Sequence, residues 1–256
     1  MGFFRFFVQS DRNSIFAMSF DSALAIPLGL VLWSAPVAAN PSDGLELSAD
    51  RYRSILGPAP QAGGNVERDD LVILRWNQRT RYPQGVNHSW HFLNRYVGTF
   101  DAAVGGNMAK SAPVLSKGLM SFLKIVDNVK KDLKKNYQRP RPFISHSDIK
   151  PCLPLQSSFS YPSGHSTWYA STALLLADLM PERRERLIQV GRQGGYARVY
   201  CGMHYPSDVI AGERLAKAIT ADIIASPEWQ SFRNEVKPEV DKLLKYPPAG
   251  LPLLSN

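Results

Sequence analysis

Apolar residues recur along this chain at three- and four-residue steps, and this spacing constrains the fold more than any other feature. Side chains spaced in this way lie on one face of an α-helix. The clearest example lies in residues 116–135, whose apolar positions are Leu119, Phe122, Leu123, Val126, Val129 and Leu133. Helical patterns also begin near Asp69, cover 88–104, 163–179, 182–202 and 206–226, and resume at Pro227. Because no clear alternating strand pattern appears, the predicted fold class is all-α.

Prolines, glycines and small residues divide these helices. An Arg-Pro-Arg-Pro segment, Arg139 to Pro142, ends the helix of 116–135, since proline stops helix propagation. A loop is expected over 143–161, and residues 40–64, rich in Pro, Gly, Ser and Ala, are expected to form a loosely structured lead-in. No solenoid repeat is visible. We predict a single helical domain over 40–256, with its motif-bearing core at about 116–226.

The N-terminal segment has the pattern of a cleaved signal peptide. An uncharged apolar run over 23–39 follows two arginines and ends with Val37 and Ala39 at the positions that signal peptidase prefers. The alternative is a membrane anchor, but Pro27 and Pro36 interrupt a run shorter than the ~20 residues that a spanning helix needs. We predict a signal peptide over 1–39, a periplasmic or secreted protein, and no integral membrane segment after cleavage. Met18 is an alternative start.

The two cysteines, Cys152 and Cys201, exclude a disulfide-rich miniprotein and a four-cysteine zinc site. In an exported protein they are expected to pair, because oxidising compartments favour disulfides. Two buried free thiols are the alternative.

The composition is that of a folded protein with an excess of positive charge. Of 256 residues, 44% are hydrophobic and 20% charged, which argues against a disordered chain. The formal charge of +8 indicates an anionic partner, such as nucleic acid, lipid headgroups or small phosphates. Eight Lys or Arg residues but only two Asp residues lie between Lys117 and Arg141, so most of the excess is local.

Three segments carry residues suited to phosphate chemistry. Lys134 and Arg141 place two cations at a helix end and in the loop that follows. Residues 162–165, Pro-Ser-Gly-His, begin a helix whose N-terminal amides can bind an anion. In the third segment, Arg198 precedes His204 and Asp208, whose four-residue spacing lets the carboxylate accept a hydrogen bond from the imidazole.

Each segment also has a structural interpretation when it is taken alone. Lysine-rich helix faces are usually solvated, Ser163 is a suitable N-cap, and a histidine near an aspartate is commonly a structural hydrogen bond. The occurrence of all three segments in one chain favours the functional interpretation.

The three segments together resemble the signature K-x6-RP, PSGH, SR-x5-H-x3-D of the phosphatidic-acid-phosphatase type 2 and vanadium haloperoxidase superfamily. Residues 159–166, Phe-Ser-Tyr-Pro-Ser-Gly-His-Ser, resemble the GSYPSGHT element of bacterial class A non-specific acid phosphatases. The resemblance covers about 119–225. Phe159 and Ser166 depart from that element, and Ala197 replaces the serine before Arg198, so a weakened phosphate contact is expected there.

The resemblance implies a role for each matching residue. His204 would attack phosphorus, Asp208 would orient the ring of His204, and His165 would act as general acid and base. Five residues would hold the phosphoryl oxygens: Lys134, Arg141, Ser163, Gly164 and Arg198. No metal or cofactor is expected, although phosphate or vanadate could occupy the pocket. His88 and His91 lie on one helical face and are expected to be structural, and His146 has no assigned role.

The predicted function is that of an exported, metal-independent acid phosphatase that acts on phosphate monoesters through a phosphohistidine, with broad specificity and phosphotransferase capacity. The alternatives are a vanadate-dependent haloperoxidase using the same pocket, a soluble lipid phosphatase, and a basic protein that binds phosphate or nucleic acid without turnover. Small phosphomonoesters are the expected partners. Nucleic-acid binding is not expected as the main role, and a homo-oligomer is allowed.

Overall fold

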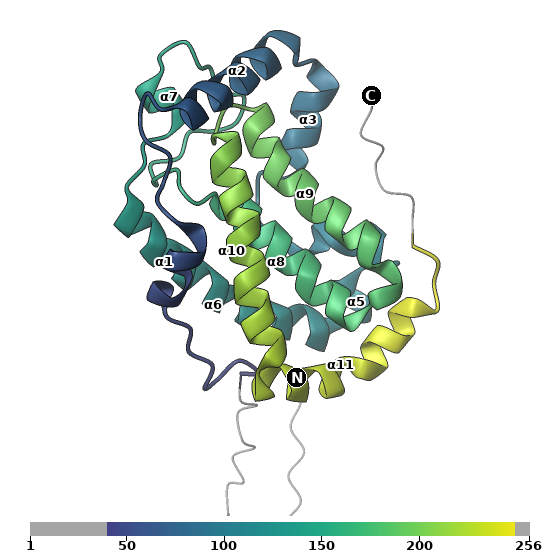
Figure 1. Ribbon diagram of the computed structural model, residues 1–256. Coiled ribbons are helices and arrows are strands. Elements are labelled where there is room, and N and C mark those ends of the chain that lie inside the picture. The colour runs from purple at the N-terminus through teal and green to yellow at the C-terminus, as the bar shows by residue number, and fades with distance from the viewer. Residues whose placement is uncertain (1–39, 249–256) are drawn as a thin grey trace, which may run out of the picture. The chain divides into compact units, whose positions relative to one another are not determined.

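The computed structural model describes residues 40–248, and these lie within the compact unit Ala38–Asn256. Their regular structure is helical, with no strand among them (Figure 1). The prediction of an all-α fold is therefore confirmed for this part of the chain. The predicted signal peptide, 1–39, lies outside the described residues.

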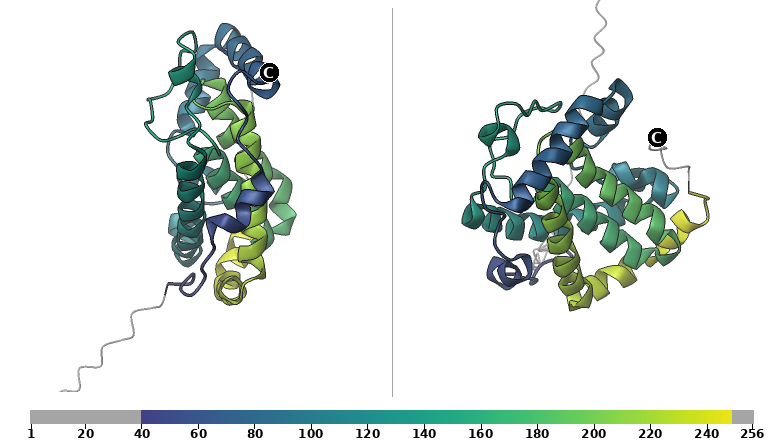
Figure 2. Two further views of the ribbon diagram at one scale, coloured as in Figure 1. Left: turned by 60° about the vertical axis from the view of Figure 1, so that its left-hand side comes forward. Right: turned by 45° about the horizontal axis from the view of Figure 1, so that its top comes forward.

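The long helices pack around α8 (Gly164–Leu179), which is buried along most of its length. It contacts α9 (Arg184–Tyr200) and α10 (Pro206–Ala225), as well as α6 (Pro113–Tyr137) (Figures 1 and 2). Small residues allow the closest of these approaches: a Cβ atom on Gly194 would clash with the ring of Tyr169, and one on Gly212 would lie 2.8 Å from the carbonyl oxygen of Ser163.

The apolar face of α6 supplies one wall of this core, as its spacing predicted. Its members are no more than 2% exposed: Leu119, Phe122, Leu123, Val126, Val129 and Leu133. Full burial of a side chain of this size contributes about 1.5–3 kcal/mol relative to exposure. The helix begins at Pro113, slightly earlier than predicted, and ends at Tyr137, before the Arg-Pro-Arg-Pro segment.

The remaining helices surround this core. They are α1 (Ala49–Leu56), α2 (Asn65–Thr80), α3 (Pro83–His91), η1 (Val97–Phe100), α4 (Asp101–Val104), α5 (Met108–Ser111), α7 (Pro142–Ser145), η2 (Pro181–Arg183) and α11 (Pro227–Leu244). None of the helices described between residues 40 and 248 combines the length and the hydropathy of a membrane-spanning segment.

Three local predictions were wrong, and the smallest error is in the loop expected over 143–161, whose first residues belong to the single-turn helix α7. The lead-in of 40–64 contains helix α1, which buries Tyr52 and Leu56 in the core. The hydroxyl of Tyr52 donates a hydrogen bond of 2.6 Å to Asp222, so a contact distant in sequence holds a segment whose composition resembles a loop. The helix predicted over 88–104 is interrupted after His91, and its second half forms η1 and α4.

Cys152 and Cys201 form a disulfide, and the backbone N–H of Cys152 donates a 3.2 Å hydrogen bond to the carbonyl of Cys201. The bridge joins the loop after α7 to the end of α9. It therefore anchors this loop beside the segment that carries His204.

Candidate active site

The residues that the three motifs singled out lie at helix ends that converge on one site. Lys134 is in the last turn of α6, and Arg141 directly precedes α7. Ser163 is the N-cap of α8, followed by Gly164 and His165 in its first turn. The third motif supplies Arg198 from the last turn of α9, His204 from the link that follows, and Asp208 from the first turn of α10.

The imidazole of His204 is buried and held from both sides. Its Nδ1 lies 3.3 Å from Oδ2 of Asp208 and 3.2 Å from Oγ of Ser160. Its Nε2 lies 3.1 Å from a guanidinium nitrogen of Arg141, which can only donate. A ring that accepts at Nε2 carries its proton at Nδ1, facing Asp208. Nε2 is therefore the nitrogen with an available lone pair.

Burial and the surrounding cations favour the neutral form of the His204 ring. Burial lowers its pKa well below the ordinary value, and the cations Arg141, Lys134 and Arg198 lower it further. A neutral imidazole is the form that can act as a nucleophile.

Asp208 is held by residues that the motifs did not single out. Arg139 donates a 2.7 Å hydrogen bond to Oδ1, and the backbone N–H of Tyr205 and the hydroxyl of Ser160 donate to Oδ2. Burial raises the pKa of Asp208, whereas Arg139 and the Ser160 hydroxyl act in the opposite direction. These donors fix the carboxylate where it can orient His204.

Arg139 is itself fixed by further contacts. Its guanidinium lies 3.8 Å from the centre of the Tyr205 ring, donates to the Ser207 hydroxyl at 2.8 Å and lies 3.5 Å from a carboxylate oxygen of Asp70. Asp70 in turn accepts a 3.0 Å hydrogen bond from the Ser207 backbone N–H. Helix α2 thus supports the His204–Asp208 pair through Arg139.

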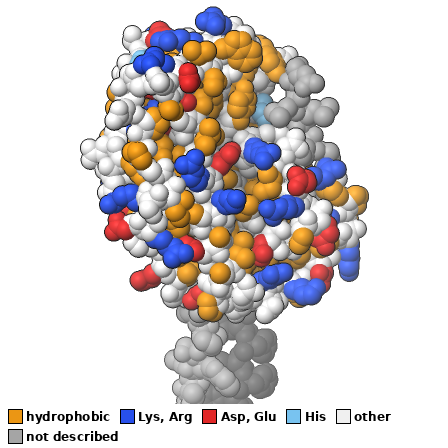
Figure 3. Space-filling model, viewed as in Figure 1, with side chains coloured by type: hydrophobic (Ala, Val, Ile, Leu, Met, Phe, Trp, Pro, Cys, Tyr) orange, Lys and Arg blue, Asp and Glu red, His pale blue; other side chains and the backbone are white. Residues whose placement is uncertain are grey.

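The local excess of positive charge divides into buried and exposed halves. Of the eight cations between Lys117 and Arg141, Lys130, Lys134, Arg139 and Arg141 are buried, and the other four are exposed. Figure 3 shows exposed Lys and Arg side chains scattered among Asp and Glu on the viewed face. The sequence did not assign Lys130, but its four-residue spacing from Lys134 puts both lysines on one helix face, and both lie beside Gly164.

Arg141 and Lys134 are positioned by the loop before α8, and Arg141 also by the segment between α9 and α10. Arg141 donates to the Ser158 carbonyl at 2.7 Å and to the Met203 carbonyl at 2.9 Å. Lys134 donates to the carbonyls of Phe159 and Ser160. Burial, with the neighbouring charge of Arg141, lowers the pKa of Lys134 well below its usual value, and burial lowers that of Arg141 to about 10.

Arg198 is the most unusual of these cations. Its side chain is fully buried, and none of its three guanidinium nitrogens has a hydrogen-bond partner among residues 40–248. Burial, together with the charge of Arg141, lowers its pKa to about 9. A buried guanidinium without a partner is costly. The five N–H donors of a guanidinium suit an anion with several acceptor oxygens.

His165 lies at the N-terminus of α8 with one nitrogen held by the backbone. Its Nε2 lies 2.8 Å from the carbonyl oxygen of Leu93 and therefore carries a proton. Burial and then the charge of Arg198 lower its pKa well below the ordinary value. A bound anion would offset the cations and raise this pKa.

Ser163 forms the N-cap of α8 that its sequence position allowed, and its backbone connects this N-cap to α10. Its Oγ accepts a 3.4 Å hydrogen bond from the Ser166 N–H, as an N-cap does, and its own N–H donates to the Asp208 carbonyl at 2.9 Å. The second bond ties the α8 N-terminus to the segment that bears Asp208. Gly164 lies so near the lysines that a Cβ atom there would be 3.1 Å from Cδ of Lys130 and 3.7 Å from Cε of Lys134.

The site thus combines a neutral, oriented imidazole with several buried cations and a second histidine. Among the described residues, no group of three or more His, Cys, Asp or Glu side chains is placed to hold a metal ion. Ala197, next to Arg198, lines a separate cavity described below. The cations and the helix N-terminus suit a phosphoryl group, and the two histidines suit nucleophilic and acid–base roles.

Comparison with known proteins agrees with this chemistry. A model of the PAP2 superfamily matches residues 114–230. A non-specific acid phosphatase of Providencia stuartii is 33% identical over 202 residues, which are 75% of this chain and 82% of that protein. An acid phosphatase of Zymomonas mobilis is 34% identical over 197 residues, or 73% of this chain and 74% of that protein.

Among solved structures, a transmembrane PAP2 type phosphatidylglycerolphosphate phosphatase of Bacillus subtilis aligns with a TM-score of 0.48 and 22% identity. The alignment covers 68% of this chain and 89% of that one.

Proposed function

The chain belongs to the PAP2 superfamily and is a phosphoric monoester hydrolase, and we propose that it is an exported acid phosphatase working through a phosphohistidine at His204. The observation that carries this proposal is the buried Arg198 guanidinium, which has no partner among the described residues and lies among other cations beside His204. A phosphoryl group supplies the negative charge and the acceptor oxygens that this guanidinium lacks.

In the first step, Nε2 of His204 attacks phosphorus and the bond from phosphorus to the ester oxygen breaks. Asp208 accepts a hydrogen bond from Nδ1–H of His204 and stabilises the positive charge that develops on the ring. Arg141, already 3.1 Å from Nε2, is near enough to donate to a phosphoryl oxygen when phosphorus approaches that nitrogen. Lys134, Arg198, Ser163 and the Gly164 N–H complete the proposed oxygen cage.

The leaving alcohol takes a proton from His165. Because Nε2 of His165 faces the Leu93 carbonyl, Nδ1 is the nitrogen that delivers this proton. In the second step His165 accepts a proton from water, the water oxygen bonds to phosphorus, and His204 is released. The chemistry needs His165 protonated and His204 neutral, so an acidic optimum is expected. The proposed steps use no metal ion, so the activity is expected to be independent of metal.

Two features support export. The predicted signal peptide ends at Ala39, and the Cys152–Cys201 disulfide is typical of an oxidising compartment. Broad specificity and phosphotransfer to alcohols complete the proposal, because the contacts described above are all suited to the phosphoryl group and none to a particular alcohol.

A pH-resolved substrate panel tests the proposal. The purified protein is assayed between roughly pH 4 and 7 with an aryl phosphate, nucleoside monophosphates and a lipid phosphate, with and without EDTA and vanadate. We expect hydrolysis that EDTA does not affect and vanadate inhibits. Halide oxidation that appears only with vanadate and peroxide would instead indicate the haloperoxidase, and activity on the lipid alone would indicate a lipid phosphatase.

His204→Ala tests the nucleophile. This variant should lose turnover and the acid-labile phosphoenzyme that denaturing quench traps from labelled substrate. His91→Ala is the matched control, because His91 is exposed and lies outside the site. Turnover close to wild type in His204→Ala would refute the assignment.

A further inference from the structure

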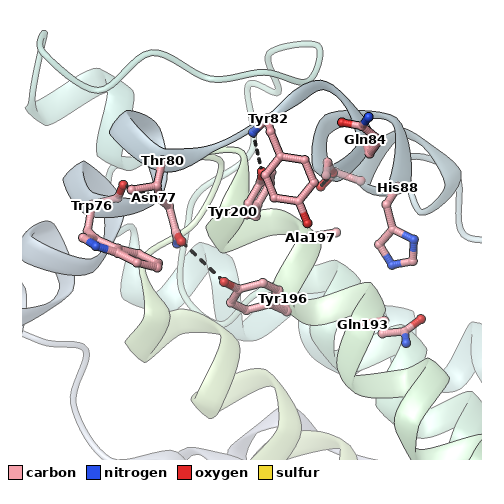
Figure 4. A pocket seen from close by; sticks show the side chains of 12 residues that line it. Trp76, Asn77, Thr80, Tyr82, Gln84, His88, Gln193, Tyr196, Ala197 and Tyr200 are labelled. Atoms are coloured by element: carbon pink, nitrogen blue, oxygen red, sulfur yellow. Dashed lines mark hydrogen bonds between the residues drawn. The ribbon is translucent and has the colours of Figure 1, made fainter. Parts of the chain in front are cut away.

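A cavity of about 480 Å³ lies between α2, α3 and α9 (Figure 4). Its size is in the range of small-molecule sites. Twelve residues line it, among them Trp76, Asn77, His88, Gln193, Tyr196 and Tyr200. None of them belongs to the catalytic cluster.

The cavity lies on a different face of α9 from Arg198. Its four lining residues on this helix, at positions 193, 196, 197 and 200, follow the spacing of a single helix face. Arg198 is displaced from Ala197 by about 100° around the helix axis. A ligand of this cavity would therefore occupy a site separate from the phosphoryl group.

Buried amides form part of its lining. Gln193 is 4% exposed and Asn77 is 1% exposed. Within residues 40–248, neither amide atom of Gln193 has a hydrogen-bond partner, and the same holds for Nδ2 of Asn77. The Oδ1 atom of Asn77 accepts a 3.4 Å hydrogen bond from the Tyr196 hydroxyl, as Figure 4 shows. Buried amide groups are costly without partners, so these atoms indicate a ligand with complementary donors and acceptors.

Aromatic rings form other parts of the lining. Trp76 and Tyr196 are 56% and 49% exposed, which leaves much of each ring accessible. The Tyr200 ring packs against α3, where its Oη accepts a 3.0 Å hydrogen bond from the Tyr82 N–H (Figure 4). Gly85 permits this packing, because a Cβ atom there would clash with the Tyr200 hydroxyl. These rings offer flat surfaces for stacking.

The lining contains no Asp, Glu, Lys or Arg. Its one histidine, His88, has a pKa lowered by burial and by the neighbouring His91, which favours the neutral ring. Nε2 of His88 adds another buried polar atom without a partner in the described part of the chain. The cavity is therefore suited to an uncharged ligand and not to a phosphate.

We propose that this cavity binds the base of an uncharged nucleoside. A glutamine amide presents one donor and one acceptor side by side, and this arrangement pairs with the edge of a nucleobase. Nucleobases also stack on aromatic side chains with their edges hydrogen-bonded to polar groups. The buried amides of Gln193 and Asn77 supply the edge contacts, and Trp76 and Tyr196 supply the rings. This site does not depend on the phosphatase mechanism.

Calorimetric titration of the purified protein with adenosine, guanosine, cytidine and uridine tests the proposal. Saturating inorganic phosphate occupies the catalytic cluster throughout, so heat that remains reports a separate site. At least one nucleoside should bind under these conditions. Gln193→Leu removes both amide atoms and should weaken that binding roughly tenfold or more, as expected for the loss of two hydrogen bonds.

The matched control is Gln189→Leu, because Gln189 is exposed, lies on the same helix and does not line the cavity. It should bind as wild type does. The melting temperature of Gln193→Leu should equal or exceed that of wild type, because an amide without partners is replaced by an apolar group. Loss of binding in a variant that melts in this way is loss of the site and not of the fold.

Three results would overturn the proposal. In the first, no nucleoside binds, or binding is equal in wild type and Gln193→Leu. In the second, methyl glucoside binds as well as the nucleosides, which would identify a site for sugar rings. In the third, the protein is a dimer that Trp76→Ala dissociates, which would identify a second copy as the occupant of the cavity.

Discussion

Replacement of Arg198 by methionine separates the stability of the site from its activity. The guanidinium is fully buried and has no hydrogen-bond partner among the described residues, so its charge is costly while no anion is bound. Replacing buried charges with apolar residues of similar size often stabilises a protein by about 1–4 kcal/mol. For a chain of this size, 1 kcal/mol corresponds to roughly 2–4 °C in Tm. We expect Arg198→Met to melt at least about 2 °C above wild type without phosphate.

Phosphate should raise the Tm of wild type more than that of Arg198→Met. A ligand at a hundredfold excess over its Kd stabilises a folded protein by about 2.7 kcal/mol, so phosphate should raise the Tm of wild type. Arg198→Met lacks the donors and should lose most of this increase. Its kcat on an aryl phosphate should fall by about 10²–10³, the usual effect of removing one donor from a transition-state oxygen.

The assay is differential scanning calorimetry with and without phosphate, combined with steady-state kinetics. Arg192→Met is the matched control, because Arg192 lies on the same helix and is exposed; neither its kcat nor its response to phosphate should change. The reasoning is refuted if Arg198→Met melts below wild type without phosphate, or if phosphate stabilises both proteins equally.

Three further predictions follow from the site. Arg139→Gln should lower kcat by roughly 10- to 100-fold with little change in KM, because Asp208 loses a charged hydrogen bond of about 1.5–3 kcal/mol. Arg139→Lys should restore part of the rate. An unchanged kcat in Arg139→Gln would contradict this positioning role. Cys152→Ser should lower the free energy of unfolding by about 4 kcal/mol, because the bridge to Cys201 spans 49 residues. Denaturant titration measures this difference. If the variant unfolds at the same denaturant concentration as oxidised wild type, the bridge does not contribute to stability. Because burial lowers the pKa values of His165 and His204, stability without phosphate should be full above about pH 6.5, the ordinary histidine value, and should decline as the pH falls towards the lower folded-state values. Thermal melts from pH 7 to 5 should show this decline, and a slope unaltered in His165→Asn would contradict the assignment of part of it to that ring.

The fold could be predicted wherever one helix face is buried and the other is solvated. Helix α6 fulfils this condition, and its apolar spacing predicted both its existence and its buried face. Helix α1 does not, because its short sequence lies among Pro and Gly residues and its burial depends on contacts such as Tyr52 with Asp222, 170 residues away. Such a contact leaves no local pattern, so composition alone indicated a loop.

The sequence predicted the reacting residues of the site better than the residues that position them. Motif spacing singled out His204 and Asp208, which the structure brings together, because their four-residue separation spans a single turn. The sequence assigned Arg139 only to the segment that ends a helix, because no local pattern shows that Arg139 and Arg141 bind different partners. The distinction arises from α2 and α10, which bring Asp70 and Asp208 to Arg139. Such positioning contacts join helices that are distant in sequence, so they can be identified only from the folded structure.

Ala197 shows how a single position on α9 separates the two sites. From the sequence, the missing hydroxyl was expected to weaken a contact with phosphate. The side chain of Ala197 lines the cavity between α2, α3 and α9, whereas the side chain of the neighbouring Arg198 lies near His204. Arg198 and the cavity residues Gln193, Ala197 and Tyr200 thus lie on different faces of α9. Ala197→Ser should therefore add a hydroxyl to the neutral cavity and leave the KM for phosphate esters unchanged, which steady-state kinetics can measure. A lowered KM would show that the residue at position 197 contacts the phosphate ester.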